Sequence, residues 1–203
     1  MARILILFAH PALEKSRVHR RLLARVPDGV TVHDLYQAYP DFDVDVRREQ
    51  ELLLAHDLVV LQHPFFWYST PPLIKQWEDL VLEHGWAYGS QGTQLRGKWM
   101  INILTAGGRA AAYQHEGYNR FTVRELLAPI EQTARLCGMH YLPPYVIHGT
   151  HRLDEPQIER QAELYGAFLS ALRDDAYDLH ALAPLPGLDP ENLPLPLTAE
   201  VAP

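Results

Sequence analysis

The sequence has little cysteine and no long apolar run. Cys137 is the only cysteine among 203 residues, which excludes an internal disulfide framework and a thiolate metal cluster. The apolar run that follows Arg3 ends at Ala9. That is too short for a secretion signal, and no other stretch approaches the roughly 20 apolar residues of a membrane-spanning helix. We therefore expect a cytoplasmic protein in a reducing setting.

Positive charge is also scarce, and the excess of acid lies at the C-terminus. The net charge is −7, and residues 174–203 hold six of the 25 acidic residues but no lysine or arginine. The rest of the chain is nearly neutral, with 18 basic and 19 acidic residues, so it lacks the basic surface that nucleic-acid binding requires. Six prolines in the same C-terminal segment predict no regular structure there. We expect one domain over 1–173 and an acidic, proline-rich tail over 174–203, whose leucines can dock on the body or on a partner (Leu182, Leu185, Leu188, Leu193, Leu195 and Leu197).

Several common motifs are missing. The chain has no G-x-G-x-x-G, no P-loop, no H-E-x-x-H and no G-x-S-x-G, which argues against a dinucleotide fingerprint, a zinc protease and a serine hydrolase. The spacing His148-x-x-His151 has no carboxylate beside it and is weak as a metal signature. We predict no metal site.

Apolar runs and helical patterns alternate along the chain. Continuous apolar stretches predict strands at 3–9, 30–35, 57–62, 98–104 and 145–148. Helical spacing predicts helices at 16–26, at 47–55, from Pro71-Pro72 to Gly85, at 121–137 and from Asp154 to about 172. Pro129 should kink or divide the fourth of these helices. The alternation predicts an α/β fold with five parallel strands.

The loops that follow the first and fourth strands suit a phosphate-bearing cofactor. Ser16 can cap the helix that begins with Arg17, Val18 and His19, and helix N-termini bind phosphate. Taken alone, Ser16 is better explained as a plain N-cap. Gly107-Gly108 follows the fourth strand, where we expect positive φ and close backbone approach, although a generic turn also explains two glycines.

The loop after the third strand holds four consecutive aromatic residues, Phe65 to Tyr68. Flat side chains there can cover a cofactor ring, but a core or interface cluster is the more common use of such a run. His10 and His63 both end strands before a proline. A place lining the site is plausible for each, although a buried histidine bonded to backbone is the simpler interpretation of His63.

In these stretches the chain resembles the flavodoxin-like NAD(P)H:quinone oxidoreductases, and most closely their bacterial branch of ancillary subunits for glutathione-regulated potassium-efflux antiporters. The resemblance covers residues 3 to about 172. It rests on the segments 8–11, 35–42, 62–69, 71–75, 84–89, 107–108, 137–138 and 142–144, of which His-Gly-Trp-Ala-Tyr-Gly (84–89) and Tyr-Pro-Asp-Phe (39–42) are the most specific. The tail lies outside it.

The resemblance implies a flavodoxin-like three-layer fold that binds FMN. It places His10, Ser16, Arg17, Val18 and His19 around the phosphate and ribityl chain. It places Phe65, Phe66, Trp67 and Tyr68 along the isoalloxazine ring, and Thr105, Ala106, Gly107 and Gly108 at the polar edge of that ring. The chain departs from the family pattern at His19, where asparagine is usual, and at Ala106, where a second threonine is common. Tyr113 fits a catalytic tyrosine of the wider family, and His115 is the candidate for its catalytic histidine, because Tyr118 stands where this branch tends to have one.

The function implied is an FMN-dependent NAD(P)H oxidoreductase that passes two electrons to a quinone or another small electrophilic acceptor. The alternative is a regulatory ancillary subunit that binds and activates a potassium-efflux antiporter, which would make it peripheral on the inner face of the membrane. A flavodoxin-style electron carrier fits less well, since it needs an exposed flavin edge. We also expect a homodimer, with Trp67, Tyr68 and Trp86 covering the cofactor across the two-fold interface.

Overall fold

A parallel β-sheet organises the chain. The computed structural model describes residues 1–191, 193, 194 and 196. The strands, all parallel, are β1 (Ile4–Phe8), β2 (Thr31–Asp34), β3 (Leu58–Pro64), β4 (Trp99–Thr105), β5 (His140–Tyr141) and β6 (Tyr145–Ile147). Their order is β2-β1-β3-β4-β5, and β6 also pairs with β4. The predicted parallel α/β fold is confirmed.

The predicted fifth strand is divided in two. β5 pairs with the start of β4 and β6 with its end, and Pro143-Pro144 lies between them. Proline has no N–H to donate to a ladder, so the pair interrupts the hydrogen bonds without ending the strand direction. The sheet therefore has five strand positions, and β5 and β6 together fill the last of them.

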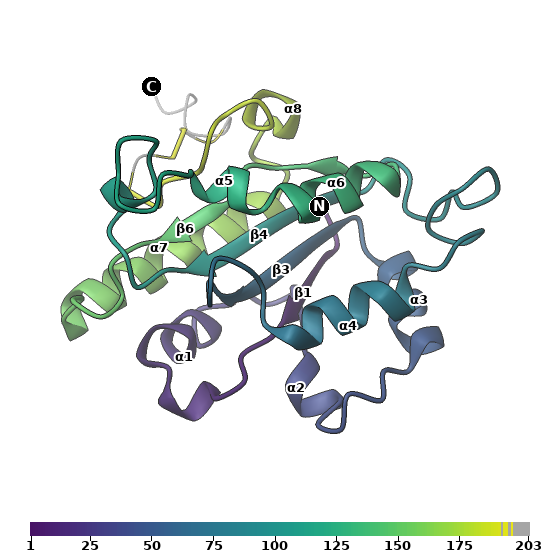
Figure 1. Ribbon diagram of the computed structural model, residues 1–203, viewed down its shortest axis with the longest axis horizontal. Helices are drawn as coiled ribbons and strands as arrows, with labels where there is room; N and C mark the ends of the chain where they lie inside the picture. The colour runs from purple at the N-terminus through teal and green to yellow at the C-terminus, as the bar shows by residue number, and fades with distance from the viewer. Residues whose placement is uncertain (192, 195, 197–203) are drawn as a thin grey trace.

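Helices cover both faces of the sheet (Figure 1). One face carries α1 (Arg17–Leu23) and α7 (Glu155–Arg173); the other carries α2 (Leu35–Ala38), α3 (Val46–Ala55), α4 (Pro72–Val81), α5 (Val123–Leu126) and α6 (Ala128–Leu136). Alternate strand residues enter the two cores: Leu5 and Leu7 face α4, whereas Ile4, Ile6 and Phe8 face α7. Two 3₁₀ turns (Leu13–Lys15 and Ala110–Ala112) complete the loops at the strand ends.

The predicted helix over 121–137 is divided into α5 and α6, as Pro129 indicated. Pro129 lies in the first turn of α6, where its missing N–H costs no intrahelical bond. Thr122 and Glu125 form a capping box at the start of α5, and Asp154 and Gln157 form another at the start of α7.

The buried carboxylate of Glu49 ties three elements of one core together. Its Oε1 accepts hydrogen bonds from Tyr39 Oη at 2.5 Å and from His33 Nε2 at 2.7 Å, and its Oε2 accepts from Trp77 Nε1 at 2.8 Å. Burial raises the pKa of Glu49, but the bonds from His33, Tyr39 and Trp77 outweigh it and leave the pKa below its usual value. The carboxylate therefore fixes α3 to β2 and α4.

The segment after α7 contains regular structure. Residues Leu179–Leu182 form α8, and Leu182 and Leu188 are 4% and 3% exposed within the core around α7. Leu188 pairs with Tyr145 as an isolated bridge. The expectation of no regular structure is therefore wrong for 179–182, because the burial of leucines stabilises this helix despite the prolines that follow it. Docking on the body is confirmed for Leu182 and Leu188, whereas Leu195 and Leu197 lie outside the described residues.

We expect Leu188→Ala to lower the free energy of unfolding by about 2–4 kcal/mol, because it leaves a cavity in a packed core. Urea denaturation of the full chain measures the change. Leu80→Ala, at a side chain that is 37% exposed, is the control and should cost clearly less. Equal, small losses for both variants would mean that the segment after α7 adds nothing to the core.

Candidate functional site

The strand register brings four loops to one edge of the sheet. Phe8 pairs with Gln62, Pro64 with Thr105, and Thr105 with Ile147. Residues 9–10, 65–68, 106–108 and 148–151 consequently leave the sheet at its carboxyl edge, where open α/β sheets bind ligands. A cavity of about 330 Å³, the strand-edge cavity, lies there; it is lined by Phe65, Trp67, Tyr68, Gly107, Gly108, Tyr113 and His151.

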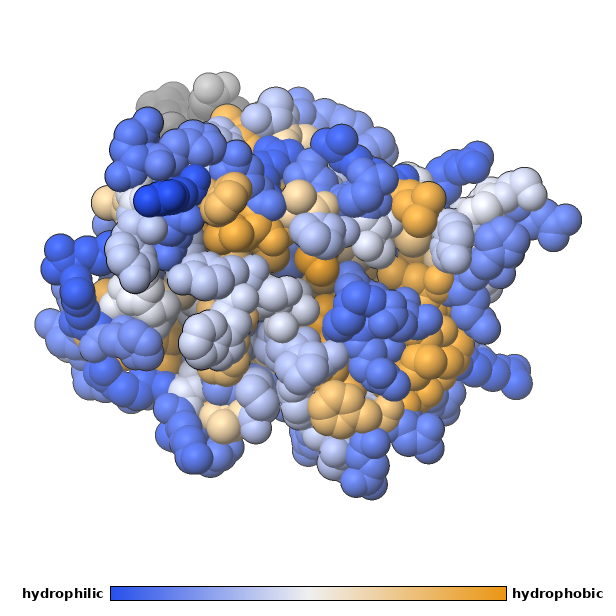
Figure 2. Space-filling model, viewed as in Figure 1, coloured by the Kyte–Doolittle hydropathy of each residue, from blue (hydrophilic) through white to orange (hydrophobic). Residues whose placement is uncertain are grey.

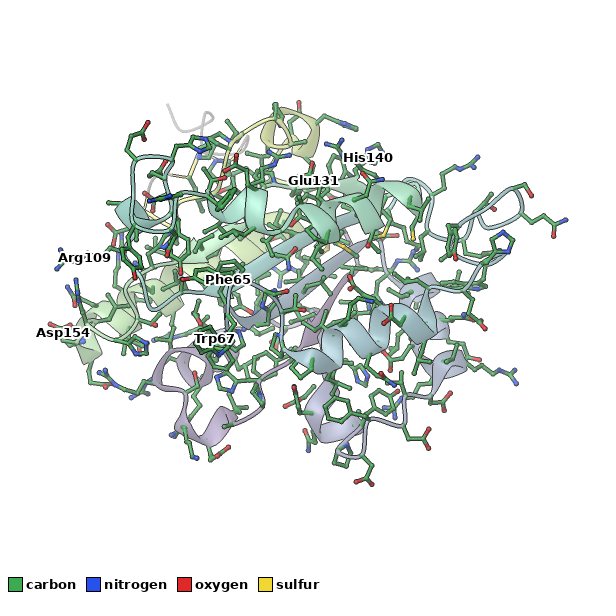
Figure 3. The ribbon with its side chains drawn as sticks, viewed as in Figure 1. Phe65, Trp67, Arg109, Glu131, His140 and Asp154 are labelled. Atoms are coloured by element: carbon green, nitrogen blue, oxygen red, sulfur yellow. The ribbon has the colours of Figure 1, made fainter. Side chains whose placement is uncertain are left out.

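The aromatic loop is a tight turn with an unusual backbone. Phe66 and Ser69 pair across it, with Ser69 N donating to Phe66 O at 3.1 Å. Trp67 and Tyr68 both have positive φ, 49° and 66°, in positions that normally favour glycine or asparagine. Such conformations in non-glycine residues cost on the order of 1 kcal/mol or more each and occur preferentially at functional sites. The turn leaves 92% of Trp67 exposed, whereas Phe65 is buried. Figure 3 labels both side chains.

Gly107 and Gly108 are needed for space, not for positive φ. Neither glycine has a positive φ, so the expectation of left-handed backbone is wrong here. A Cβ on Gly107 would lie 2.6 Å from the His151 ring, and one on Gly108 would lie 3.0 Å from Tyr113 Cε2. The two glycines therefore let both rings close on the backbone at the cavity wall.

Unused backbone donors surround the strand-edge cavity. Within the described part of the chain, the N–H groups of Trp67, Gly107 and Gly108 make no hydrogen bond. Phe65 N, by contrast, donates to Thr105 O, and Ala106 N donates to Ile147 O. The backbone amides of Trp67, Gly107 and Gly108 are thus free to donate to the polar edge of a ring, whereas the Ala106 amide is bonded within the sheet.

The start of α1 adjoins the same edge. Ser16 caps the helix, since its Oγ accepts from His19 N at 3.1 Å, so the plain N-cap interpretation is confirmed for its side chain. The Arg17 side chain is paired with Glu155 at 2.8 Å, and that of Val18 is buried in the core. What these two residues present toward the edge is their backbone N–H, because the first turn of a helix has no intrahelical acceptor.

His10 lies beside this helix start. Its Nδ1 accepts from Ala12 N at 3.1 Å, so in the neutral ring Nε2 carries the proton and can donate to a ligand. Burial lowers the pKa of His10, although Glu14 and Asp34 oppose the shift. Its ring contacts those of His19 and Phe66, with centroids 5.3 Å and 6.0 Å apart.

His19 points inward and supports the end of β4. Its Nε2 lies 3.0 Å from Thr105 Oγ1, while its Nδ1 is buried without a partner in the described chain. Burial, with contributions from His10 and His63, holds the pKa of His19 well below its usual value, so the ring is neutral. The side chain thus links α1 to Thr105 beneath the edge.

His63 takes the structural role. It is fully buried, with Nδ1 3.0 Å from Pro64 O and Nε2 2.9 Å from Asn102 Nδ2, and burial lowers its pKa to about 4. The simpler interpretation given to it from the sequence is therefore confirmed.

Tyr113 lines the strand-edge cavity and packs between Phe65 and His148, with ring centroids 6.0 Å and 5.6 Å away. Burial, with a contribution from Tyr68, raises the pKa of its phenol, which remains protonated at neutral pH.

His115 is not among the residues that line this cavity: its ring is 65% exposed, with Nε2 3.7 Å from Glu125. His148 and His151 lie at the carboxyl edge of the sheet instead. Their spacing in the sequence suggested only a weak metal signature. The strand-end rule applied to the last strand would have found both.

No cluster of three or more His, Cys, Asp and Glu suitable for a metal ion occurs in the part of the chain that the structure describes. None of the helices in that part of the chain is long and apolar enough to span a membrane.

A model of the flavodoxin-like fold matches residues 2–169. The chain belongs to the flavodoxin-like fold family. It is 42% identical over 172 residues to the glutathione-regulated potassium-efflux system ancillary protein KefG of Enterobacter sp. (strain 638), covering 84% of this chain and 94% of that protein.

Two solved flavodoxin-like structures are similar throughout the same region. The general stress protein 14 of Treponema denticola, in complex with FMN, superposes with a TM-score of 0.80 at 42% identity, covering 84% of this chain and 99% of that one. A protein from P. pentosaceus described as an NADPH-quinone reductase has a TM-score of 0.74 at 33% identity, covering 82% and 97%. One of these two similar structures is thus described as an NADPH-quinone reductase, and the other contains FMN.

Proposed function

We propose that this chain is an FMN-dependent NAD(P)H oxidoreductase that passes two electrons to a quinone or a similar small acceptor. The observation that carries the proposal is the strand-edge cavity, with its aromatic turn, free amides and protonated Tyr113 at the carboxyl edge of a flavodoxin-like sheet. Its likeness to an FMN complex and to an NADPH-quinone reductase supports the cofactor and the reaction.

The residues present fit FMN. Gly107 and Gly108 leave space that a Cβ would fill, as a flat ring lying against backbone requires. In the proposed arrangement His10 Nε2, Ser16 and the amides of Arg17 and Val18 hold the phosphate and ribityl chain, and His19 supports Thr105 beneath them. Phe65, Phe66, Trp67 and Tyr68 lie along the ring, and the backbone of Thr105 to Gly108 faces its polar edge.

When bound, FMN supplies the acceptor for a hydride from NAD(P)H and passes the electrons to the second substrate. The protein's part is to orient and to exclude water. The amides of Trp67, Gly107 and Gly108, which make no hydrogen bond within the described chain, would donate to the polar edge of the bound ring and stabilise negative charge there. Tyr113 can donate a further hydrogen bond, because its phenol keeps its proton. His115 stays a prediction for the second catalytic residue, and His151 is the stronger candidate by position.

The visible spectrum of the purified protein tests this proposal. We expect flavin absorption bands and release of FMN, identified by its mass, at close to one per chain. Purified protein that stays colourless and does not take up added FMN would contradict it.

We expect Tyr113→Phe to lower kcat for quinone reduction about tenfold while FMN content stays unchanged, because the variant removes one hydrogen bond worth about 1.4 kcal/mol to a charged group. Steady-state kinetics at saturating NADPH measure the change. Tyr177→Phe is the control, because Tyr177 packs beside Phe168 and does not line the strand-edge cavity. An unchanged kcat in Tyr113→Phe would remove Tyr113 from the chemistry.

The second candidate function is that of an ancillary subunit of a potassium-efflux antiporter, with the chain held at the inner face of the membrane through that partner. The 42% identity with KefG over nearly its whole length favours it. Co-purification of a tagged chain with an antiporter, and loss of efflux on its removal, would support this role. Full turnover without any partner, together with unchanged efflux, would favour the free-standing enzyme.

The homodimer is supported by exposed aromatic side chains in the loops after β3 and β4, of which Trp67 and Tyr68 line the strand-edge cavity. They are Phe66, Trp67, Tyr68, Tyr118 and Phe121, exposed by 48%, 92%, 44%, 91% and 53%. Figure 2 views the face built by α4, α5 and α6, on which apolar side chains form separate patches among polar ones. Trp86 is half-buried and packs against the core, so Trp67 and Tyr68 are the stronger candidates for an interface. A monomer by light scattering at micromolar concentration, with full activity, would exclude this assembly.

A further inference from the structure

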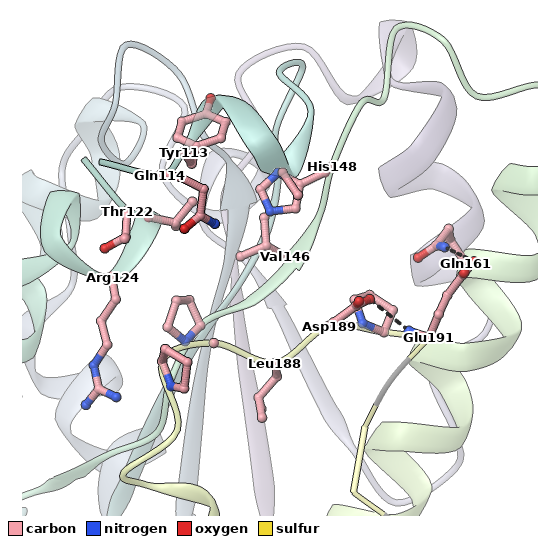
Figure 4. A pocket seen from close by; sticks show the side chains of 16 residues that line it. Tyr113, Gln114, Thr122, Arg124, Val146, His148, Gln161, Leu188, Asp189 and Glu191 are labelled. Atoms are coloured by element: carbon pink, nitrogen blue, oxygen red, sulfur yellow. Dashed lines mark hydrogen bonds between the residues drawn. The ribbon is translucent and has the colours of Figure 1, made fainter. Parts of the chain in front are cut away.

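A second cavity, of about 430 Å³, shares Tyr113 with the strand-edge cavity. Figure 4 shows the side chains that line it. One wall comes from the flavodoxin-like body: the loop after β4, the start of α5, β6 and α7. The other wall comes from residues 183–191, here called the C-terminal strap. The family match ends at residue 169, so the strap lies outside the matched region.

The strap is fixed in place at three points. Arg124 donates to the carbonyl oxygens of Ala183 and Leu185. Leu188 N donates to Pro144 O at 2.9 Å, and Gln161 Nε2 donates to Glu191 Oε1 at 3.2 Å. A segment held this firmly would be expected to fill the space beneath it with side chains. It leaves a half-open cavity instead, with room for a ligand.

The lining indicates the chemistry of that ligand. Seven of the sixteen lining residues are aliphatic or proline: Ala110, Val123, Pro144, Val146, Pro186, Leu188 and Pro190. Two acidic residues, Asp189 and Glu191, also line it, whereas the guanidinium of Arg124 is already paired with Glu131 at 3.2 Å. An anion such as a nucleotide phosphate therefore finds no available cation here, and a neutral ring compound fits better.

Two buried polar atoms in the lining have no partner in the described chain, Gln161 Oε1 and His148 Nδ1. The orientation of the Gln161 amide is fixed by its bond to the Glu191 carboxylate, which can only accept, so the free Oε1 is an acceptor. Leaving such a group unpaired is costly. A ligand with a hydroxyl donor would satisfy it. Figure 4 shows Gln161 beside Glu191 and apart from His148.

We propose that the cavity beneath the C-terminal strap binds a neutral aromatic compound bearing hydroxyl groups, of the quinol class. The class rests in part on the proposed function, since a quinol is the product of quinone reduction. The site lies next to Tyr113, which lines both cavities. Occupancy there would press on the ring that borders the proposed flavin site.

Isothermal titration of the full-length protein with 1-naphthol, a redox-stable hydroxyl-bearing probe, tests the site. We expect one 1-naphthol per chain, with 1-methoxynaphthalene and 1-naphthyl phosphate binding at least tenfold more weakly. Gln161→Leu should weaken 1-naphthol about tenfold and leave 1-methoxynaphthalene unchanged. Gln132→Leu, at an exposed glutamine on α6, should change neither.

The location is tested separately with Val146→Trp, which fills the cavity from β6 and should abolish 1-naphthol binding. Flavin content and thermal unfolding check that this variant folds. Unchanged 1-naphthol affinity in both Gln161→Leu and Val146→Trp would overturn the proposal, because the probe would then be binding elsewhere. Absence of FMN with normal 1-naphthol binding would defeat the proposed function and leave this site standing.

Discussion

Replacing Gly107 and Gly108 together with valine is expected to weaken FMN binding at least about 30-fold, or roughly 2 kcal/mol. The added Cβ atoms would lie 2.6 Å from the His151 ring and 3.0 Å from the Tyr113 ring. Overpacking of this kind costs about 1–3 kcal/mol at each site, and both displaced rings line the strand-edge cavity. Titration of the flavin-free protein with FMN, followed by flavin fluorescence, measures the change in Kd.

Gly187→Val is the matched control, because a Cβ there would meet nothing closer than Pro144 O at 3.9 Å. It should leave the Kd for FMN unchanged. His151→Ala added to the double variant should recover part of the affinity, since it removes one of the two clashes. Full flavin occupancy of the double variant at low FMN would mean that the ring does not lie against these glycines.

Replacing Glu49 with leucine is expected to lower the free energy of unfolding by about 3 kcal/mol or more. The change leaves the donors of His33, Tyr39 and Trp77 buried without an acceptor, and each such group costs about 1–3 kcal/mol. Urea denaturation at pH 7 measures it. Glu51→Leu on the same helix, which removes an exposed ion pair with Arg47, is the control and should cost less than about 1 kcal/mol.

The same carboxylate gives stability a predictable pH dependence. Because the folded pKa of Glu49 lies below its usual value of 4.5, its contribution is fully present above that value. It is lost as the pH falls through the lowered folded pKa. The wild-type chain should therefore lose more stability than Glu49→Leu over this acid range. Parallel slopes for the two proteins would show that Glu49 does not carry the effect.

The order of strands and helices was predictable from local patterns, because buried parallel strands are continuously apolar and proline acts at a fixed place. Pro129 divided a helix as its chemistry requires, and Ser16 and Asp154 capped theirs. Pro143-Pro144 was recognised as an interruption, although not as the division of one strand into two. The helix at 179–182 was missed, because the burial that stabilises it is tertiary.

The site was harder to predict, because side-chain direction depends on packing across the sheet. The sequence indicated the loops that carry Phe65 and Gly107, and both line the strand-edge cavity. Nothing in it indicated that Trp67 and Tyr68 would take positive φ while the glycines would not. That His19 turns inward to Thr105 depends on a contact between residues 86 positions apart. The strap cavity likewise joins residue 113 to residues 186–191, which no local pattern connects.

An anaerobic titration shows whether this chain is a two-electron flavin reductase. Purified protein loaded with FMN is mixed with NADPH or NADH while its visible absorbance is recorded, and 1,4-naphthoquinone is then added. We expect that one equivalent of at least one of the two nucleotides bleaches the flavin bands and that one equivalent of quinone restores them. Flavin that neither nucleotide bleaches, or that stays bleached after quinone is added, would contradict this function.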